Sequence, residues 1–338
     1  MGFPWDPPPA DARAADIVTL TLNPALDATT DVPELVAGPK LRCGAVRREA
    51  GGGGVNVARA VTGLGGRALA VLAAGGSTGA EIERCLVDEG VPRRVIPIAG
   101  TSRENVAVHE RASGGLYRLV MPGPALTAAE WRRCIDVAAD AAEGDLLVAS
   151  GSLPPGVPAD AYARLARTVA SRGVRLLLDT AGPGLRGGLG AGVHLIKPNA
   201  RELDELAGRA LDDAGREEFA ASIVRGGGAD VVIVTLGADG ALVVDGGGPT
   251  RIHPPPVAHP DSAVGAGDNF MAGLVLALAA ARDTAGACAV GVAAAAAALL
   301  TPGTAPCRRA DLEAMLTAMG RADDVAVLPR RATRAAAT

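Results

Sequence analysis

Residues 231–236 read V-V-I-V-T-L, and this run determines how the rest of the chain is interpreted. A continuous apolar run, without alternating polar residues, indicates a strand that is covered on both faces, as in a parallel sheet. Similar runs cover residues 17–22, 69–73, 145–149, 174–178 and 194–196, and helical patterns between them cover residues 55–63, 80–89, 128–142, 159–171 and 215–226. This alternation predicts a doubly wound α/β fold, with a mostly parallel sheet and helices on both faces.

One stretch departs from this alternation. Residues 105–110 read N-V-A-V-H-E, residues 112–115 read A-S-G-G and residues 116–120 read L-Y-R-L-V, which is the pattern of a β-hairpin with a glycine turn. A second alternating piece covers residues 40–49. We expect these pieces, with strands from about 40–49 and 104–120, to form a small antiparallel sheet that projects from the main domain as a lid.

The length of 338 residues allows one large α/β domain with an appendage, or two modest domains. We expect one domain over residues 16–320. Hydrophobic residues make up 49% of the chain and aromatic residues only 2%, so Ala, Val and Leu must fill the core. Residues 1–15 are rich in Pro and Ala and lack the pattern of a signal peptide. We expect a disordered extension there and a C-terminal tail over residues 321–338.

Several classes of protein are disfavoured by the composition. The net charge of −4 gives no support to a nucleic-acid partner. The five cysteines are odd in number and none are spaced as CxxC, which argues against a disulfide scaffold or a zinc site and for a reducing compartment. The apolar segments 270–281 and 290–300 are too short to cross a bilayer. The sequence therefore predicts a cytoplasmic protein without a membrane partner.

The strongest chemical signal is V-G-A-G-D over residues 264–268, followed by an apolar helical pattern. The turn formed by Gly265, Ala266 and Gly267 presents backbone N–H groups at a helix N-terminus, where they and the helix dipole stabilise an anion. A carboxylate in the first turn, Asp268, is placed to take a proton from an attacking hydroxyl, as phosphoryl transfer requires. The alternative is that Asp268 simply favours a helix N-terminus.

Two further motifs are weaker on their own. Residues 51–56 read G-G-G-G-V-N. The glycines, among them Gly52 and Gly53, let the backbone approach a ligand closely, with Asn56 in the first turn of the following helix, or they form a flexible loop. Residues 197–202 read K-P-N-A-R-E, in which Asn199 and Glu202 have the spacing of a capping box. Both residues could instead organise water around a magnesium ion.

Charged residues near the predicted lid complete the candidates. Lys40 and Arg42 fall on one face of the predicted strand, and Arg103 precedes the hairpin, although surface cations are usually only solvated. Asp27 follows the first strand, at the sheet edge where such folds bind ligands, or it stabilises a turn.

The order of these motifs resembles the PfkB (ribokinase-like) family of sugar kinases from about residue 17 to residue 319. In chain order, the motifs are L-N-P-A-L-D over 22–27, the glycine run, S-G-S-L-P-P-G over 150–156, K-P-N-x-x-E, T-L-G over 235–237 and G-A-G-D. Within the family the chain resembles the type II 6-phosphofructokinases, through K-L-R-C over 40–43, the four glycines and Y-R-L-V-M-P-G over 117–123. The related 1-phosphofructokinases usually carry a Lys where this chain has Gly53, and its absence fits a sugar with a free C1 hydroxyl.

The resemblance implies transfer of the γ-phosphoryl group of MgATP to the C1 hydroxyl of fructose 6-phosphate, with Asp268 as base. It implies the following roles for the other candidates: anion stabilisation by Gly265, Ala266 and Gly267; sugar binding by Asp27, Gly52, Gly53, Asn56 and Ser152; binding of the sugar phosphate by Lys40, Arg42 and Arg103; ATP binding by Lys197, Asn199, Thr235, Gly237 and Gly303; and magnesium binding by Asn199 and Glu202. It also implies a homodimer formed through the lid.

The chain departs from the family pattern at two places. Ala263 stands where a Thr is common, which puts potassium dependence in doubt, and Ser262 is a candidate substitute. Thr301 stands where the family has an Asn near the adenine.

Other functions remain open. Tagatose 6-phosphate kinase and 1-phosphofructokinase are the nearest alternatives, and a catalytically silent sugar-phosphate-binding regulator is a remote one. A nicotinamide oxidoreductase is disfavoured because Asn23 and Pro24 stand where a glycine-rich turn would follow the first strand.

Overall fold

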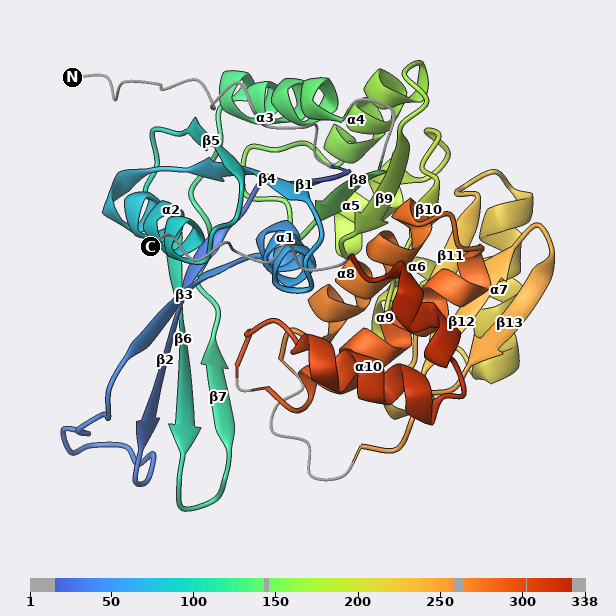
Figure 1. The fold of residues 1–338 in the computed structure, drawn as a ribbon. Coiled ribbons are helices and arrows are strands. Elements are labelled where there is room, and N and C mark those ends of the chain that lie inside the picture. Colours follow the sequence, from blue (N-terminus) through green and yellow to red (C-terminus); the bar gives the residue numbers. More distant parts are fainter. Residues whose placement is uncertain (1–15, 143–145, 258–263, 302, 330–338) are drawn as a thin grey trace, which may run out of the picture.

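A computed structural model describes residues 16–142, 146–257, 264–301 and 303–329 (Figure 1). The predicted N-terminal extension, Ser262, Ala263 and the last residues of the tail lie outside these ranges. Within them, a nine-stranded sheet forms the centre of the molecule, in the order β13-β12-β11-β10-β9-β8-β1-β4-β5. Its strands are β1 (Ile17–Thr21), β4 (Ala68–Ala74), β5 (Arg93–Pro97), β8 (Leu146–Ser150), β9 (Arg175–Asp179), β10 (Leu195–Ile196), β11 (Val231–Thr235), β12 (Ala241–Asp245) and β13 (Gly248–Ile252).

The central sheet is mostly parallel, as the continuous apolar runs predict. Within this sheet, the neighbours from β11 through β10, β9, β8, β1 and β4 to β5 all pair parallel. Among its described strands, only β12 and β13 at one edge pair antiparallel. All five residues of β1, from Ile17 to Thr21, are buried because helices cover both of its faces. The doubly wound α/β prediction is confirmed.

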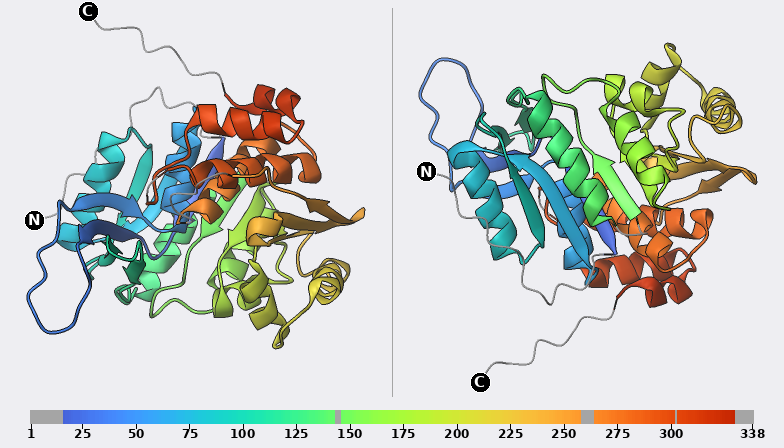
Figure 2. Two further views of the ribbon diagram at one scale, coloured as in Figure 1. Left: turned by 90° about the horizontal axis from the view of Figure 1, so that it is seen from below. Right: turned by 90° about the horizontal axis from the view of Figure 1, so that it is seen from above.

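Helices cover both faces of this sheet and bury two separate apolar clusters (Figure 2). The first cluster includes residues of α1 (Gly53–Gly63), α2 (Gly76–Asp88), α8 (Ala266–Ala279), α9 (Thr284–Ala298) and α10 (Arg309–Ala318). The second includes residues of α3 (Ala128–Ala141), α4 (Ala161–Ala170), α5 (Gly182–Gly188), α6 (Ala200–Ala207) and α7 (Asp213–Arg225). Short 3-10 helices are η1 (Gly237–Asp239) and η2 (Ala322–Val327).

Small side chains allow α8 and α9 to pack closely against each other. A Cβ added to Gly273 of α8 would lie 2.7 Å from the carbonyl oxygen of Val290 on α9, so glycine is required at this crossing. No helix in the described part of the chain is both long enough and apolar enough to cross a membrane.

A second sheet of four strands projects from the domain, in the order β3-β2-β6-β7. Its strands are β2 (Ala25–Val32), β3 (Arg47–Gly51), β6 (Arg103–Glu110) and β7 (Leu116–Leu119). The β6–β7 hairpin is as predicted, but two features differ from the sequence expectation. The small sheet includes β2, and β2 pairs parallel with β6, so the sheet is not wholly antiparallel.

The stretch before β3 also differs from the prediction. Residues 40–46 form an exposed loop, and only residues from Arg47 onward are a strand. Lys40 and Arg42 therefore do not share the face of a strand. At the C-terminus, part of the expected tail is ordered, because η2 packs on α10 and Leu328 is buried in the first apolar cluster.

Candidate active site

The candidate residues gather where the parallel strands end. Asn23 follows β1, Ser150 ends β8, Asp179 ends β9, Lys197 follows β10 and Thr235 ends β11. Because all five strands run parallel, their carboxyl ends lie at the same edge of the sheet, which is where open α/β sheets bind ligands.

Helix α8 begins at this edge with the predicted glycine turn. Gly265 is its N-cap, with a φ of 79° that favours glycine. The N–H groups of Ala266, Gly267 and Asp268 occupy the first turn, where amides have no acceptor inside the helix. Asn269 holds this end in place, because its amide donates to the Gly265 carbonyl and accepts from the Cys307 N–H at 2.8 Å. These bonds hold the turn in place, and its backbone amides make it a candidate anion cradle.

Lys197 supplies the positive charge next to this cradle. Its Nζ forms an ion pair of 2.9 Å with Asp179 Oδ1, and both side chains are almost fully buried. A Cβ added to Gly267 would lie 3.8 Å from Lys197 Nζ, so the ammonium group faces the first turn of α8. Burial opposes the charge on Lys197, but the carboxylate of Asp179 raises the pKa of Lys197 above its ordinary value, and the lysine stays protonated.

Asp268 is poised to exchange a proton near neutral pH. Burial raises the pKa of Asp268 to about 7, and the negative charge of Asp179 adds to this effect. A hydrogen bond from Asn56 and the charge of Lys197 act in the opposite direction. A carboxylate with such a pKa suits a general base, because it is largely ionised at physiological pH yet basic enough to accept a proton.

The glycine run brings α1 against the same edge. Gly52 has a φ of 106°, and a Cβ there would lie 3.0 Å from Pro24 Cα. A Cβ on Gly53 would lie 2.2 Å from Ser150 Oγ and 2.9 Å from the Gly151 nitrogen. This close packing accounts for glycine at position 53 whatever the sugar substrate is. It also sets Asn56, three residues further on, so that its Nδ2 donates to Asp268 Oδ2 at 2.9 Å.

Asp27 and Arg103 lie on neighbouring strands of the small sheet, close to its junction with the main domain. Asn105 Nδ2 donates to Asp27 Oδ1 at 2.8 Å, and burial raises the pKa of Asp27. The Arg103 guanidinium donates to the carbonyl oxygens of Asn23 and Met121, at 3.0 and 3.2 Å. Arg103 also interacts electrostatically with Asp27, so the structure brings these two predicted residues together.

Asn199 and Glu202 form the capping box that their spacing suggests. Asn199 Oδ1 accepts from the Glu202 N–H, and Glu202 Oε2 accepts from the Asn199 N–H, each at 2.9 Å. Asn199 also pairs with Thr235 through an isolated backbone bridge, which joins two of the predicted ATP-binding residues. Gly237 lies just beyond, with a φ of 63° and open space where a Cβ would be.

The acidic groups here exceed the local positive charge. Asp179, Glu202 and Asp268 all interact with the single ammonium of Lys197, and burial raises the pKa of Glu202. The described residues contain no cluster of three His, Cys, Asp or Glu that could cage a metal ion. Carboxyl groups that outnumber the local cations fit magnesium, which keeps most of its waters and binds through one or two carboxylates and substrate phosphates.

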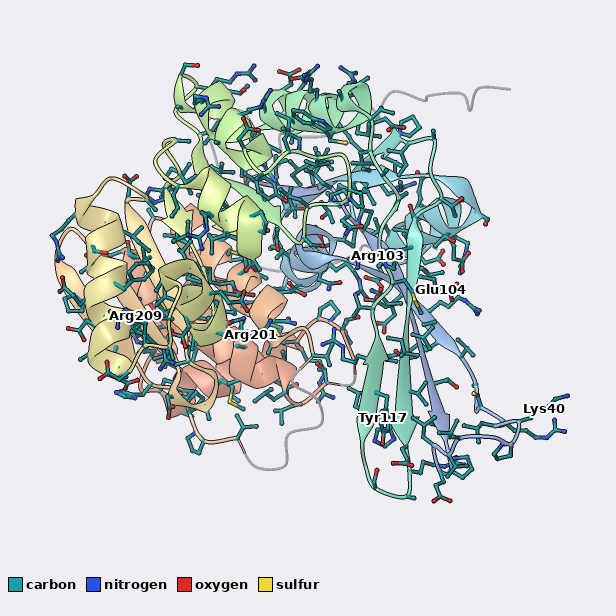
Figure 3. All side chains as sticks on the ribbon, turned by 180° about the vertical axis from the view of Figure 1, so that it is seen from behind. Lys40, Arg103, Glu104, Tyr117, Arg201 and Arg209 are labelled. Atoms are coloured by element: carbon teal, nitrogen blue, oxygen red, sulfur yellow. The ribbon has the colours of Figure 1, made fainter. Side chains whose placement is uncertain are left out.

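Three predicted residues lie apart from this cluster or at its margin. Lys40 is at the far end of the small sheet, well away from Arg103, and Arg42 is exposed in the same loop (Figure 3). Within one chain, Lys40 therefore lies apart from Arg103, and Arg42 follows two residues later in the same exposed loop. Gly303 faces the small sheet, because a Cβ there would lie 2.3 Å from Arg47 Nη2.

Ser152 is connected to the candidate site through Asn23. It is exposed, and its Oγ accepts a hydrogen bond of 3.0 Å from Asn23 Nδ2. This bond ties the loop after β8 to the loop after β1.

Sequence reasoning missed Asp179, Asn105 and Arg59. Asp179 directly follows a predicted strand, and that position could have identified it as a candidate. Asn105 lay within the predicted hairpin, but its bond to Asp27 depends on the unexpected pairing of β2 with β6. Arg59 lies inside α1, and no sequence signal indicates that its side chain is buried beside Asn56.

Comparisons with known proteins agree with this geometry. A family model described as pfkB family carbohydrate kinase matches residues 20–311. The chain is 44% identical over 310 residues to ATP-dependent 6-phosphofructokinase isozyme 2 of Mycobacterium tuberculosis, with 91% of each chain covered. It is 34% identical over 266 residues to 1-phosphofructokinase of Xanthomonas campestris, with 77% of this chain and 83% of that protein covered.

Solved structures show the same similarity. Structures of phosphofructokinase-2 from Escherichia coli with potassium and with fructose-6-phosphate have TM-scores of 0.87 and 0.85 to this chain, at 40% and 39% identity. Each alignment covers 91% of this chain and 100% of the solved one. The chain belongs to the PfkB family of carbohydrate kinases.

Proposed function

We propose that this protein transfers the γ-phosphoryl group of ATP to the C1 hydroxyl of fructose 6-phosphate. The observation that carries the proposal is the position of Asp268, in the first turn of α8 beside Lys197 and within a hydrogen bond of Asn56. The identity to a 6-phosphofructokinase exceeds that to a 1-phosphofructokinase, at 44% against 34%, and supports this choice of substrate.

In the proposed reaction, the C1 oxygen attacks the γ-phosphorus while the bond from that phosphorus to the bridging oxygen of ADP breaks. Asp268 accepts the hydroxyl proton, and the sugar leaves with a second phosphate. The first-turn amides of Ala266, Gly267 and Asp268 and the ammonium of Lys197 stabilise the negative charge on the transferring group. Asp27 and Asn56 hold the sugar hydroxyls so that C1 faces the anion cradle.

Magnesium would be held near Glu202 and Asn199, where carboxylates outnumber cations. When bound, it neutralises charge on the ATP phosphates. Thr235, Gly237 and Gly303 contribute to the nucleotide side of the site. Potassium is a second candidate cation.

The phosphate of the sugar lies toward Arg103. In the proposed homodimer, Lys40 of a second copy would add to that phosphate site, since it lies far from Arg103 within one chain. Arg42, in the same exposed loop, would accompany it. The exposed apolar residues of β7 and its C-terminal extension support pairing through the small sheet: Leu116, Tyr117, Leu119, Val120 and Met121. Closure of this sheet as a lid would exclude water and prevent wasteful hydrolysis of ATP.

Initial rates of ADP release test the proposal. They are measured with MgATP and each of four acceptors: fructose 6-phosphate, tagatose 6-phosphate, fructose 1-phosphate and fructose. The expected result is the highest kcat/KM with fructose 6-phosphate. Preference for tagatose 6-phosphate would keep the mechanism and change the substrate, and preference for fructose 1-phosphate would place the sugar phosphate elsewhere. Turnover with none of them would favour the silent regulator.

A further inference from the structure

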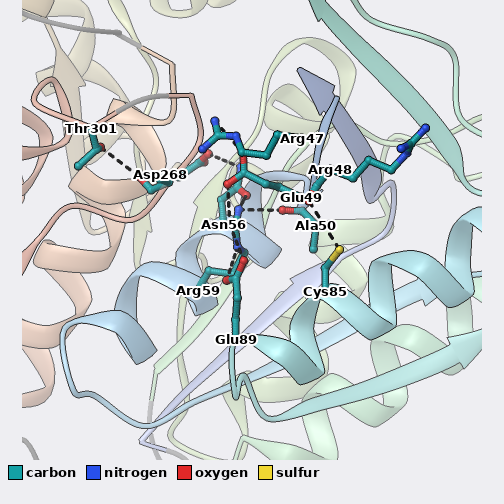
Figure 4. A network of polar contacts seen from close by, with 11 residues as sticks. Arg47, Arg48, Glu49, Ala50, Asn56, Arg59, Cys85, Glu89, Asp268 and Thr301 are labelled. Carbon is teal, nitrogen blue, oxygen red and sulfur yellow. Dashed lines mark hydrogen bonds and ion pairs between the residues drawn. The ribbon is translucent and has the colours of Figure 1, made fainter. Parts of the chain in front are cut away.

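Arg59 of α1 occupies an unusual position for a charged side chain, because its side chain is only 2% exposed. An arginine has five N–H donors, and here all five find an acceptor (Figure 4). Its Nε and Nη2 bind the two carboxylate oxygens of Glu89 at 2.7 Å each, and Nη2 also binds Glu49 Oε1 at 3.2 Å. Its Nη1 donates to the Ala50 carbonyl at 2.8 Å and to Asn56 Oδ1 at 3.3 Å.

The last of these bonds decides which way the Asn56 amide points. With Oδ1 accepting from Arg59, Nδ2 must face the other way, where it donates to Asp268 Oδ2. A flipped amide would set its oxygen against the Asp268 carboxylate and its NH₂ group against the guanidinium, so both contacts would become repulsive. The cation thus selects one orientation of the amide.

Resting on the function proposed above, we propose that Arg59 is a positioning residue that fixes the Asn56 amide toward Asp268 and couples the catalytic base to strand β3 of the small sheet. Glu49 and Ala50 belong to β3, so a displacement of that strand displaces two of the acceptors that hold Arg59. The orientation of the base then depends on the position of the small sheet.

The coupling extends to the loop that contains Gly303. Glu49 Oε2 forms an ion pair of 3.0 Å with Arg47, and Arg47 lies against Gly303. Strand β3 is therefore linked to the catalytic base through Arg59 and Asn56, and Arg47 of the same strand lies against a loop assigned to the nucleotide. Ion pairs with Glu89 and Glu49 raise the pKa of Arg59 against the effect of burial, so the cation persists throughout the working pH range.

The charged groups that face Asp268 are Asp179, Lys197 and Asp27, and each comes from a different strand or strand end. None of them is hydrogen-bonded to Arg59, although Asp27 interacts with it electrostatically, and Arg59→Lys keeps that positive charge. Loss of the Asn56 hydrogen bond would therefore raise the pKa of Asp268 while leaving these three charges in place, because that bond stabilises the carboxylate.

The test is Arg59→Lys, which keeps the buried charge but has three donors on one atom and cannot bridge all the acceptors. We expect kcat to fall by about tenfold to a hundredfold at pH 7, as for a misplaced catalytic group, with the KM values changed less than about twofold. The acid limb of the rate profile and the carboxyl ¹³C titration of Asp268 should both move to higher pH. In an Asn56→Ala background, Arg59→Lys should add little further loss, since both changes act through one amide.

The matched control is Glu89→Gln, which weakens the ion pair of Arg59 but leaves its bond to Asn56. We expect lower thermal stability with an unchanged pH profile. The proposal is overturned if Arg59→Lys leaves kcat and the titration as in the wild type, or if both variants shift them alike, because Arg59 would then be merely structural.

Failure of the proposed function and failure of the proposed role of Arg59 give different experimental results. If the wild-type enzyme phosphorylates none of the acceptors, the proposed function fails, and the titration of Asp268 still decides the role of Arg59. If Arg59→Lys does not fold, Glu49→Gln is measured in its place. It weakens one of the two contacts between Arg59 and β3, while the Ala50 carbonyl remains as an acceptor. Both kcat and the titration should therefore move in the same directions by smaller amounts, whereas an unchanged titration would contradict the coupling.

Discussion

Asn56 Nδ2 donates a hydrogen bond of 2.9 Å to Asp268 Oδ2, although the two residues are 212 positions apart in the chain. The bond joins the first turns of α1 and α8, the two helices that begin with glycine-rich turns at the active edge of the sheet. The glycine run, which is weak alone, and the stronger G-A-G-D motif thus meet at one candidate site, where Asn56 holds the Asp268 carboxylate.

The pH dependence of kcat/KM should report the state of Asp268. Its pKa is raised to about 7, so the base becomes protonated and the rate falls as the pH drops below that value. Rates measured from pH 5.5 to 9 should therefore show an acid limb near neutrality. A flat profile across this range would contradict the assignment.

The stabilisation that Asp268 contributes should fall as the pH rises, whereas the rate should rise with pH. The pKa of Asp268 is raised in the folded state from 3.8 to about 7, so the folded protein binds this proton more tightly than the unfolded chain. The associated stabilisation is complete below pH 3.8 and is lost as the pH rises toward 7. Asp268→Asn removes this loss. The melting temperature of the variant minus that of the wild type should therefore be larger at pH 8 than at pH 5. An equal difference at both values would mean that Asp268 is not perturbed.

Asp179→Asn tests the buried ion pair with Lys197. Because Lys197 is 5% exposed and would lose its charged partner, the free energy of unfolding should fall by on the order of 3 kcal/mol. The acid limb should also move to lower pH, since the charge of Asp179 raises the pKa of Asp268. Urea denaturation and the rate profile provide the two readouts.

The control for Asp179→Asn is Asp88→Asn. Asp88 pairs with Arg84 at 2.6 Å, but its side chain is 60% exposed, so the ion pair contributes little. Similar losses of stability in the two variants would show that the Lys197 pair has no special role.

Gly53→Ala tests whether packing requires this glycine. The added methyl group would approach Ser150 Oγ to 2.2 Å and the Gly151 nitrogen to 2.9 Å, so we expect destabilisation of about 1–3 kcal/mol. Gly246→Ala is the control, since nothing lies within 4 Å of its added Cβ. If Gly53→Ala leaves the free energy of unfolding unchanged, packing does not require this glycine. The choice of substrate would then remain as the reason for it.

Arg103→Ala should raise the KM for the sugar phosphate by about tenfold with a smaller effect on kcat, because it removes a charge-assisted contact made equally in the ground and transition states. Arg94→Ala, at an exposed arginine of β5, is the control and should leave both constants unchanged. An unaltered KM in Arg103→Ala would remove this residue from the phosphate site.

Much of the fold could be predicted because the strands of the central sheet are buried on both faces. Their continuous apolar runs are visible in the sequence, as for Val231–Thr235. Strand β2 could not be found in this way, because A-L-D-A-T-T-D-V contains polar residues that a half-exposed sheet tolerates. Its parallel pairing with β6 is also a contact distant in sequence, which no local pattern encodes.

The residues of the site also divide into those that a local sequence pattern reveals and those that only the fold brings together. The glycine turns, Asp268 and the capping box at Asn199 are local features with fixed spacing, so the sequence identifies them. Lys40 illustrates the opposite case, because a loop replaces the predicted strand and carries the cation away from Arg103. Arg59 was missed because most of its acceptors lie on β3 and at Glu89, just after α2, and only the fold brings these together.

The assignment of Asp268 as the general base is tested most directly by Asp268→Asn, which keeps the size of the side chain and an oxygen that can accept from Asn56. Steady-state rates are measured with ATP and fructose 6-phosphate, and the affinity of each ligand is measured by calorimetry. We expect kcat to fall by about 10²–10⁴-fold while both affinities stay close to those of the wild type. A variant that keeps nearly normal turnover, or that loses turnover only because it no longer binds its ligands, would contradict the assignment.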